Sequence, residues 1–330
     1  MAETVEPVGP GSHDEELIAL LERVSNAGRW GPDDELGTLN YITPGKRVQA
    51  AALVQLGEVL SLSYPLVTGD ADHAHVERRM LYNMVRHPVL GTPPAASDHL
   101  AMEVHQQGVT HLDCVSHVGG WDGRVYNGRR FHEVATQEGL AFGSISAQRE
   151  GIVSRGVLLD VAAAAGVEWL PPTHEIAPAD LDAAERLAGV LVSSGDVVVI
   201  RAGMDAREAA LGPDPLLSGP GPAAAEWLHE REVAVYTGDA PEHITPVAAR
   251  ILGRMPVADE EEGQVAGSAF PLPFHQIAIP AMGLVLLDHA RVEELALRCR
   301  GLQRYEFLFM AAPLVLPGGS GSPVNPLAVF

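Results

Sequence analysis

The stretch GDVVVIRAG, residues 195–203, decides the fold class because four branched apolar residues follow one another between glycines. A short apolar run bounded by turn residues is typical of a strand that is buried on both faces of a sheet. Two more runs have the same character, GVLLDVAAAAG at 156–166 and EVAVYTGDA at 232–240. Together they predict three buried strands.

Helical patterns separate these predicted strands, at 178–195 and 220–231. Alternation of strands and helices is typical of the α/β class. We also expect a helix at about 14–25, ahead of a single domain spanning 28–330, because no internal repeat or clear linker divides the chain. Residues 1–27 therefore comprise an acidic, flexible tail and this first helix. Residues 69–97 look irregular and could form a loop or lid over a site.

Composition limits the classes of partner. The 330 residues carry a net charge of -21, which argues against nucleic acid or an anionic membrane surface. No apolar stretch reaches 18 residues, and the first residues lack the basic and apolar regions of a signal peptide. Two cysteines, Cys114 and Cys299, make no disulfide framework, so a cytoplasmic location is expected.

Polar residues with metal-binding chemistry gather in HQQGVTHLDCVSH, residues 105–117. If this stretch is extended, Gln107, His111 and Asp113 share one face, and His117 has the same parity. Imidazole and carboxylate ligands suit Zn²⁺ or Mn²⁺, which would lower the pKa of a bound water and polarise a carbonyl. The alternative is that these histidines are hydrogen-bonded core residues. Cys114 has the opposite parity and is interpreted as a small core residue.

The same residues resemble a family signature. Gly108, Thr110, His111, Asp113 and His117 are similar to the HxGTHxDxPxH motif of the metal-dependent cyclase family, which includes bacterial kynurenine formamidase and isatin hydrolase. Longer members of that family also resemble four other segments of this chain: RWGPDDELGTLN at 29–40, GRVYNG at 123–128, FHQIAIPAMGLVLLDHARVEELA at 274–296 and YEFLFMAAPLVLPGGSGSPVNPLAVF at 305–330.

The resemblance implies a swivelling β/β/α fold with a mixed sheet and flanking helices. It also implies metal ligands at His111 and Asp113. His117 matches a residue that is a ligand or a proton-transfer group, depending on the member. His275 resembles a later histidine, and Asp288 stands where many members have a ligating Glu; these two belong to a second metal site in the dinuclear members.

The chain departs from the signature at several positions. Gln107 stands where the first histidine is expected, and His105 could replace it only if the strand shifts. Val109 is an additional residue, Val115 replaces the proline, and Asp288 is shorter than Glu. These departures favour one metal ion over two, held by the ligands His111, Asp113 and either Gln107 or His117.

Two candidate ligands have structural alternatives. Asp288 precedes a predicted helix and could be its N-cap, and His275 could be a hydrogen-bonded residue in a turn. Five further residues could line a pocket: Trp30, Asn40, Tyr126, Asn127 and Asp239. Trp30 and Tyr126 are equally compatible with a core role, and a turn-forming role is at least as compatible with Asp239.

The function expected from the resemblance is hydrolysis of an amide, lactam or lactone of a small, cyclic or acyl substrate, with His117 as the catalytic proton-transfer residue. The alternatives are a polyketide-type cyclase or dehydratase, and a non-catalytic ligand-binding protein with a degraded metal site. A homo-oligomer, dimer or tetramer, is expected because relatives commonly associate.

Overall fold

A sheet of nine strands organises the computed structural model, which describes residues 12–68, 76–82, 96–257 and 269–330. In spatial order its strands are β1 (Val59–Ser61), β15 (Leu327–Val329), β13 (Glu306–Ala311), β7 (Ile152–Asp160), β9 (Val197–Arg201), β11 (Val235–Gly238), β12 (Val285–Asp288), β4 (His111–Asp113) and β14 (Gly321–Pro323). The four strands from β7 to β12 are parallel, and every other pairing is antiparallel. The class is therefore α/β with a mixed sheet, as predicted.

Both faces of the central strands are buried, which is what the apolar runs predict. In β9, Val198 and Ile200 join one hydrophobic cluster, whereas Val197 and Val199 join the other. Because side chains alternate along a strand, each face needs its own apolar set. An uninterrupted run of branched residues provides both sets.

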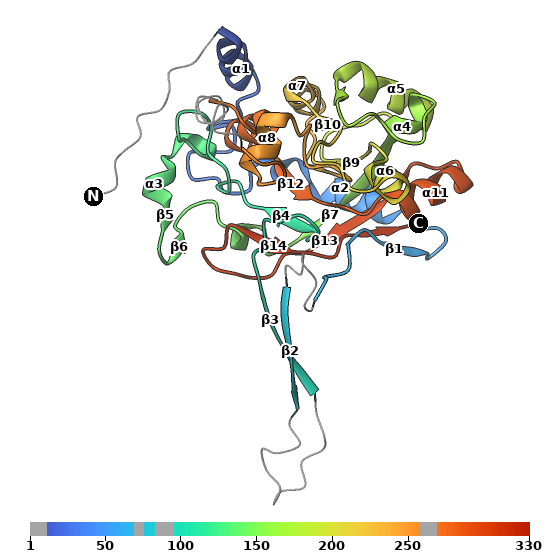
Figure 1. Cartoon of the computed structure of the whole chain (residues 1–330), viewed down its shortest axis with the longest axis horizontal. Coiled ribbons are helices and arrows are strands. Elements are labelled where there is room, and N and C mark those ends of the chain that lie inside the picture. Colours follow the sequence, from blue (N-terminus) through green and yellow to red (C-terminus); the bar gives the residue numbers. More distant parts are fainter. Residues whose placement is uncertain (1–11, 69–75, 83–95, 258–268) are drawn as a thin grey trace, which may run out of the picture.

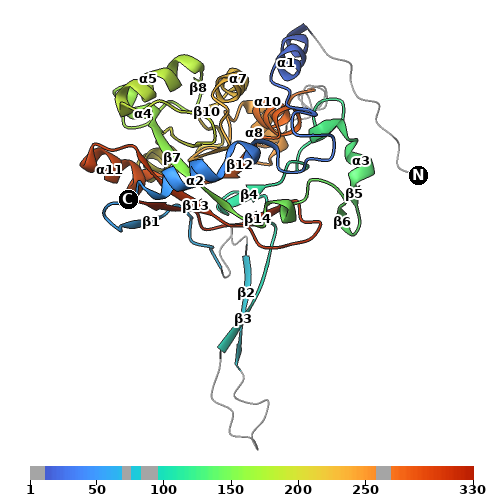
Figure 2. The same ribbon diagram turned by 180° about the vertical axis from the view of Figure 1, so that it is seen from behind.

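Helices cover the two faces. Figure 1 shows α5 and α7 on one side of the sheet, and Figure 2 shows α2 crossing the other side. The helices are α1 (Ser12–Arg23), α2 (Pro44–Ala51), α3 (Phe131–Val134), α4 (Val161–Ala164), α5 (Pro178–Ala188), α6 (Met204–Leu211), α7 (Pro222–Glu230), α8 (Pro246–Ile251), α10 (Pro273–Ile277) and α11 (Glu293–Leu302), with a π-helical turn at Ala278–Met282 and 3-10 turns at Gly37–Tyr41, Tyr126–Gly128 and Ile145–Gln148. None of the helices in these described ranges is long and apolar enough to cross a membrane.

A two-stranded ribbon projects from the body, formed by β2 (Val76–Tyr82) and β3 (Ala96–Met102) (Figure 1). The expectation of irregular structure over 69–97 was therefore wrong where β2 and the start of β3 lie. Charged residues such as Arg78 and Asp98 obscure the strand pattern, and in the structure these two form a salt bridge. The rest of that stretch lies outside the described residues. Two smaller strand pairs are β5 (Ala135–Thr136) with β6 (Gly139–Leu140), and β8 (Glu175–Ile176) with β10 (Gly219–Pro220).

Strand register brings distant polar residues together. β4 lies between β12 and β14, so that Asp288 pairs with His111 and Gly321 pairs with Asp113. Segments separated by more than 170 positions in the sequence therefore meet at one edge of the parallel set.

Candidate metal centre

His111 and Asp113 form the centre of the polar cluster. They are the first and third residues of β4, and they point to one face while Leu112 joins the core on the other. Both are buried, with 3% and 1% of their surfaces exposed. Nε2 of His111 lies 3.6 Å from Oδ1 of Asp113. The period-two prediction for this pair is confirmed.

His105 reaches the same carboxylate by way of a turn. The expectation of one extended stretch was wrong, because residues 103–110 form bends and turns and β4 begins at His111. Gly108 has φ +83°, a left-handed conformation that favours glycine. The turn leaves Nδ1 of His105 3.0 Å from Oδ1 of Asp113. The face-sharing argument for Gln107 therefore loses its basis, and the residue two positions earlier contacts Asp113.

Space for the His105 ring depends on Gly321. A Cβ placed on Gly321 would lie 2.5 Å from Cε1 of His105, well inside van der Waals contact. The neighbouring Ser320 places its hydroxyl oxygen 3.0 Å from Nε2 of His105. The C-terminal segment therefore determines where this histidine can lie.

A second group forms around Asp288. This residue ends β12, and its Oδ2 lies 3.2 Å from Nε2 of His275, which α10 carries. The N-cap interpretation of Asp288 was wrong, because α11 begins at Glu293 with Val292 as its N-cap. Within the described residues, two groups of side chains could hold a metal ion, and Asp113 belongs to both: His105, His111 and Asp113, and Asp113, His275 and Asp288.

Each of the three histidines has a partner on the side away from the carboxylates. Nδ1 of His111 lies 2.7 Å from the carbonyl oxygen of Val109, and Nδ1 of His275 lies 2.6 Å from Oε2 of Glu242. In the tautomers that donate to these oxygens, the other ring nitrogen keeps its lone pair, as metal-ligating histidines require. With Nε2 of His105 donating to Ser320, the free nitrogens of His105 and His111 face Asp113 and that of His275 faces Asp288.

Three of the four oxygens of the Asp113 and Asp288 carboxylates lack hydrogen bonds among the described residues. Both oxygens of Asp113 and Oδ1 of Asp288 are buried and make no hydrogen bond within the described part of the chain. Buried polar atoms are nearly always satisfied, and buried charges are normally paired. Burial would raise the pKa of Asp113, but the imidazoles of His117, His105 and His111 hold it below its usual range. The residues present therefore fit a divalent cation.

His117 belongs to neither of the two groups. Its ring stacks on that of His105, with 3.6 Å between the centroids and 9° between the planes. Burial lowers its pKa to about 4, although Asp113 acts in the opposite direction. Stacking holds the His117 ring beside His105, a candidate ligand. Because this contact is made by the ring faces, it leaves the ring nitrogens of His117 available for other partners.

His289 is a neighbour that the sequence did not single out. It follows Asp288 with φ +57°, an uncommon conformation for a residue other than glycine, and its ring centroid lies 6.0 Å from that of His111. Burial lowers its pKa to about 4. Strained backbone beside a polar cluster is a pointer to function.

Four of the residues predicted to line a pocket contact partners that belong to neither candidate metal group. The side chains of Asn40, Tyr126 and Asn127 donate hydrogen bonds to Asp34, the last of these to its backbone carbonyl. Trp30 packs edge-on against Tyr41. Asp34 therefore connects the segments 29–40 and 123–128. The turn-rich sequence around it gave no indication that Asn40 and Tyr126 would both donate to its carboxylate.

Asp239 follows β11 as predicted, but its oxygens have backbone partners. They accept hydrogen bonds from the N–H groups of Ala202, Gly203 and Met204 at 2.7–2.8 Å. These contacts hold the start of α6, which is a structural role. Substrate contact by Asp239, Trp30, Asn40, Tyr126 and Asn127 stays a prediction.

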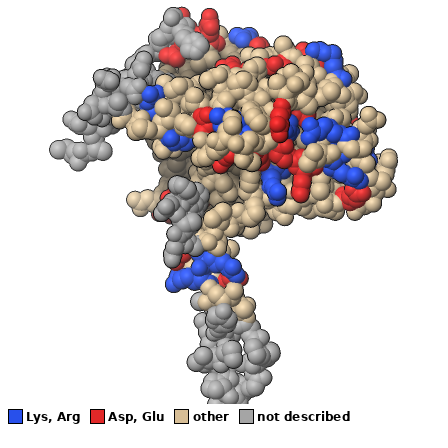
Figure 3. Space-filling view, turned by 45° about the vertical axis from the view of Figure 1, so that its right-hand side comes forward, with Lys and Arg blue, Asp and Glu red and all other residues tan. Residues whose placement is uncertain are grey.

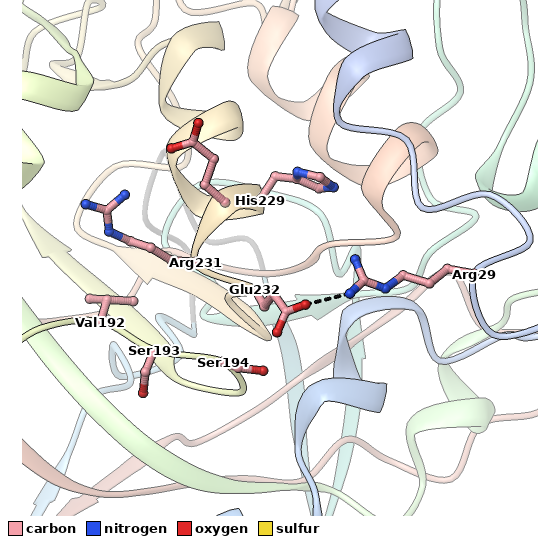
Figure 4. Close-up of a pocket in the computed structure, with 8 residues that line it drawn as sticks. Arg29, Val192, Ser193, Ser194, His229, Arg231 and Glu232 are labelled. Atoms are coloured by element: carbon pink, nitrogen blue, oxygen red, sulfur yellow. Dashed lines mark hydrogen bonds and ion pairs between the residues drawn. The ribbon is translucent and has the colours of Figure 1, made fainter.

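A surface hollow of about 570 Å³ lies apart from these groups (Figure 4). Both arginines that line it are paired: Arg29 lies 2.5 Å from Glu232, and Arg231 contacts Asp182. None of the candidate metal ligands lines it. The hollow therefore lacks the unsatisfied groups that mark the metal centre.

Comparison with known proteins identifies the family. Residues 55–243 match the sequence model of a family described as "Putative cyclase". The chain belongs to this cyclase family. Among curated proteins, none matches the chain.

Several solved structures share the fold of this chain. A crystal structure of a novel cyclase is 28% identical with a TM-score of 0.75, and the match covers 93% of this chain and 99% of that one. Isatin hydrolase A from Labrenzia aggregata, bound to benzyl benzoate, is 20% identical with a TM-score of 0.52 over 84% of this chain and 94% of that one. An isatin hydrolase bound to the product analogue thioisatinate is 18% identical with a TM-score of 0.52 over 87% and 95%. The cyclase fold of this chain is therefore one that hydrolases also use.

Proposed function

We propose that this chain is a metal-dependent hydrolase that cleaves a C–N or C–O bond in a small amide, lactam or lactone. The convergence of three imidazoles on two buried carboxylates carries the proposal, since three of the four carboxylate oxygens make no hydrogen bond within the described residues. An imidazole and carboxylate ligand set suits Zn²⁺ or Mn²⁺. The isatin hydrolases of the same fold support the assignment.

His105, His111 and Asp113 would hold one ion, and Asp113, His275 and Asp288 would hold a second. A bound ion supplies a water of lowered pKa and polarises a substrate carbonyl. The ligands come from strands β4 and β12 and from segments packed against them, so the sheet maintains their separation. Rigid elements hold such groups more accurately than loops do.

His117 provides the proton transfer. Cleavage of a C–N or C–O bond leaves a nitrogen or oxygen that must gain a proton, and a neutral imidazole beside the ligands can take a proton from the attacking water and pass it to this leaving group. Stacking on His105 orients the ring. Partial exposure of His117 leaves it accessible to a substrate.

The substrate is proposed to be small and neutral or modestly charged. The net charge of -21 would not attract a polyanion. Figure 3 shows basic and acidic side chains interspersed on one face of the body, so the negative charge is not uniform there. Isatin and simple lactones are the first compounds to test, since the neighbouring hydrolases act on isatin.

The deciding experiment combines metal content with isotope incorporation. We expect one or two ions per chain, at least one of which His111→Ala loses, and ¹⁸O from labelled water in the product. Turnover without ¹⁸O would instead indicate a cyclase or dehydratase. Absence of metal after reconstitution with Zn²⁺ or Mn²⁺ would leave a ligand-binding protein as the better interpretation.

A further inference from the structure

Glu242 makes a buried contact with His275 that the proposed reaction does not use. Its side chain is 1% exposed and lies in the segment after β11. Oε2 of Glu242 lies 2.6 Å from Nδ1 of His275 and also accepts the backbone N–H of His275 at 3.1 Å. One carboxylate oxygen therefore fixes both the ring and the main chain of the same residue.

This contact selects the state of the His275 ring. With Nδ1–H donating to Glu242, Nε2 is the ring nitrogen left to bind a cation; in this structure it lies in hydrogen-bond contact with Asp288, 3.2 Å away. A carboxylate behind a ligating histidine also increases the basicity of the ring. Glu242 itself belongs to neither of the two candidate metal groups, so it acts through His275.

The segment that carries Glu242 is held tightly. A Cβ on Gly219 would lie 2.4–2.5 Å from the backbone carbonyl of Glu242, so glycine permits the close approach. The next residue, His243, donates its backbone N–H to Pro220 at 3.1 Å. Strand β10 therefore packs against the backbone of Glu242 and His243 and fixes the position of this segment.

The outer partners differ in charge between the two groups. The outer ring nitrogen of His111 contacts a neutral carbonyl oxygen, and that of His105 contacts a neutral hydroxyl. The outer ring nitrogen of His275 contacts a carboxylate instead. The second group consequently gathers three carboxylates, those of Asp113, Asp288 and Glu242, around one imidazole. A dication placed there would meet more negative charge than one at the first group.

We propose that Glu242 is a positioning residue that holds His275 in its metal-binding tautomer and so determines occupancy of the second group. The inference rests on the proposed function, since it concerns the same centre. A purely structural alternative exists, in which Glu242 serves only to accept the backbone N–H of α10.

Titration of the metal-free full chain with Zn²⁺ tests the role. We expect two ions for the parent chain, and for Glu242→Ala one retained ion and a second bound about 10- to 100-fold more weakly, the range for loss of an outer-shell partner. Glu242→Gln keeps an acceptor oxygen and should bind both ions with an intermediate loss. The matched control is Asp180→Asn, which alters a partly exposed carboxylate 3.1 Å from Nε2 of His174 and should change neither affinity.

The outcomes separate the two proposals. Two ions in Glu242→Ala or Glu242→Gln with parental affinities would overturn the positioning role and leave the hydrolase standing. A single ion in the parent would also overturn the positioning role, because the second group would then be no site. No ion in the parent would remove the hydrolase proposal itself. If the alanine variant fails to fold, the glutamine variant decides alone: unchanged affinity for the second ion contradicts the role.

Discussion

Asp288 lies directly opposite His111 in the antiparallel pairing of β12 with β4. Cross-strand neighbours are held at short distance by the backbone ladder itself. The two candidate metal groups are therefore connected by sheet register and by the shared Asp113, and a change in one strand affects both. Single substitutions on these strands can therefore show how much each side chain contributes to metal binding.

His105, not Gln107, is expected to be the third ligand of the first group. His105→Ala should weaken binding of one ion by more than the roughly 10- to 100-fold that loss of an outer-shell partner causes. Gln107→Ala should leave affinity near the parent value, because the chain turns at this point. Metal titration followed by elemental analysis measures both, and the reverse order of effects would contradict the assignment.

His117→Ala should separate binding from catalysis. Metal content should remain at the parent level, whereas turnover of a hydrolysed substrate should fall by about 10²- to 10⁴-fold, the usual contribution of general acid–base catalysis. The control is His132→Ala, an exposed histidine of α3. Parental turnover in His117→Ala would mean that the proton comes from another group.

Gly321→Ala should displace the His105 ring, because the new Cβ would lie 2.5 Å from Cε1. We expect a loss of about 1–3 kcal/mol in the free energy of unfolding, typical of overpacking, together with weaker binding of one ion. Gly301→Ala is the matched control, since a Cβ at Gly301 meets nothing within 4 Å. Denaturant unfolding and metal titration of both variants check this, and equal behaviour of the two would argue against the steric role.

Removal of metal should destabilise the chain. A ligand that binds the native state at 100 times its Kd adds about 2.7 kcal/mol to the free energy of unfolding. Chelation should therefore lower the melting temperature, and Zn²⁺ or Mn²⁺ should restore it. Scanning calorimetry with and without chelator measures the shift; His111→Ala should show a smaller one, and an equal shift would place the stabilising ion elsewhere.

Acid should destabilise the metal-free chain through His289. Burial lowers its pKa from 6.5 to about 4, so between these values the unfolded chain binds more protons than the native one. Stability must then fall as pH decreases from 6.5 toward 4. His289→Asn, which tolerates the left-handed backbone, should reduce the loss measured by urea unfolding at pH 7 and pH 5. An unchanged loss would show that His289 does not contribute.

The central sheet and half of the metal centre could be predicted from the sequence, because both depend on short-range periodicity. The uninterrupted apolar run in GDVVVIRAG predicts burial on both faces, and alternation from His111 to Asp113 predicts a shared face. The position of His105 could not be predicted in this way, because the left-handed Gly108 lies in a turn where side chains no longer alternate between two faces. A turn can shift a ligand by two positions without leaving a repeat pattern.

Other contributions depend on pairings that no local pattern encodes. Glu242 and His275 are 33 residues apart and meet only because α10 packs beside the end of β11. Asp34 joins two segments that the sequence suggested as pocket walls, and only their mutual contacts reveal a structural role. Asp288 was ambiguous for the same reason: the start of α11 had to be known before capping could be dismissed.

The turn at Gly108 also bears on how other chains with this centre could be found. The donor atoms of His105 and His111 meet at Asp113 although five residues separate these two histidines, whereas three separate the first two histidines of the HxGTHxDxPxH signature. A search that demands fixed spacing would discard this chain. A pattern that allows a variable gap before H-x-D, and requires a glycine at the strand position paired with the aspartate, would retain it.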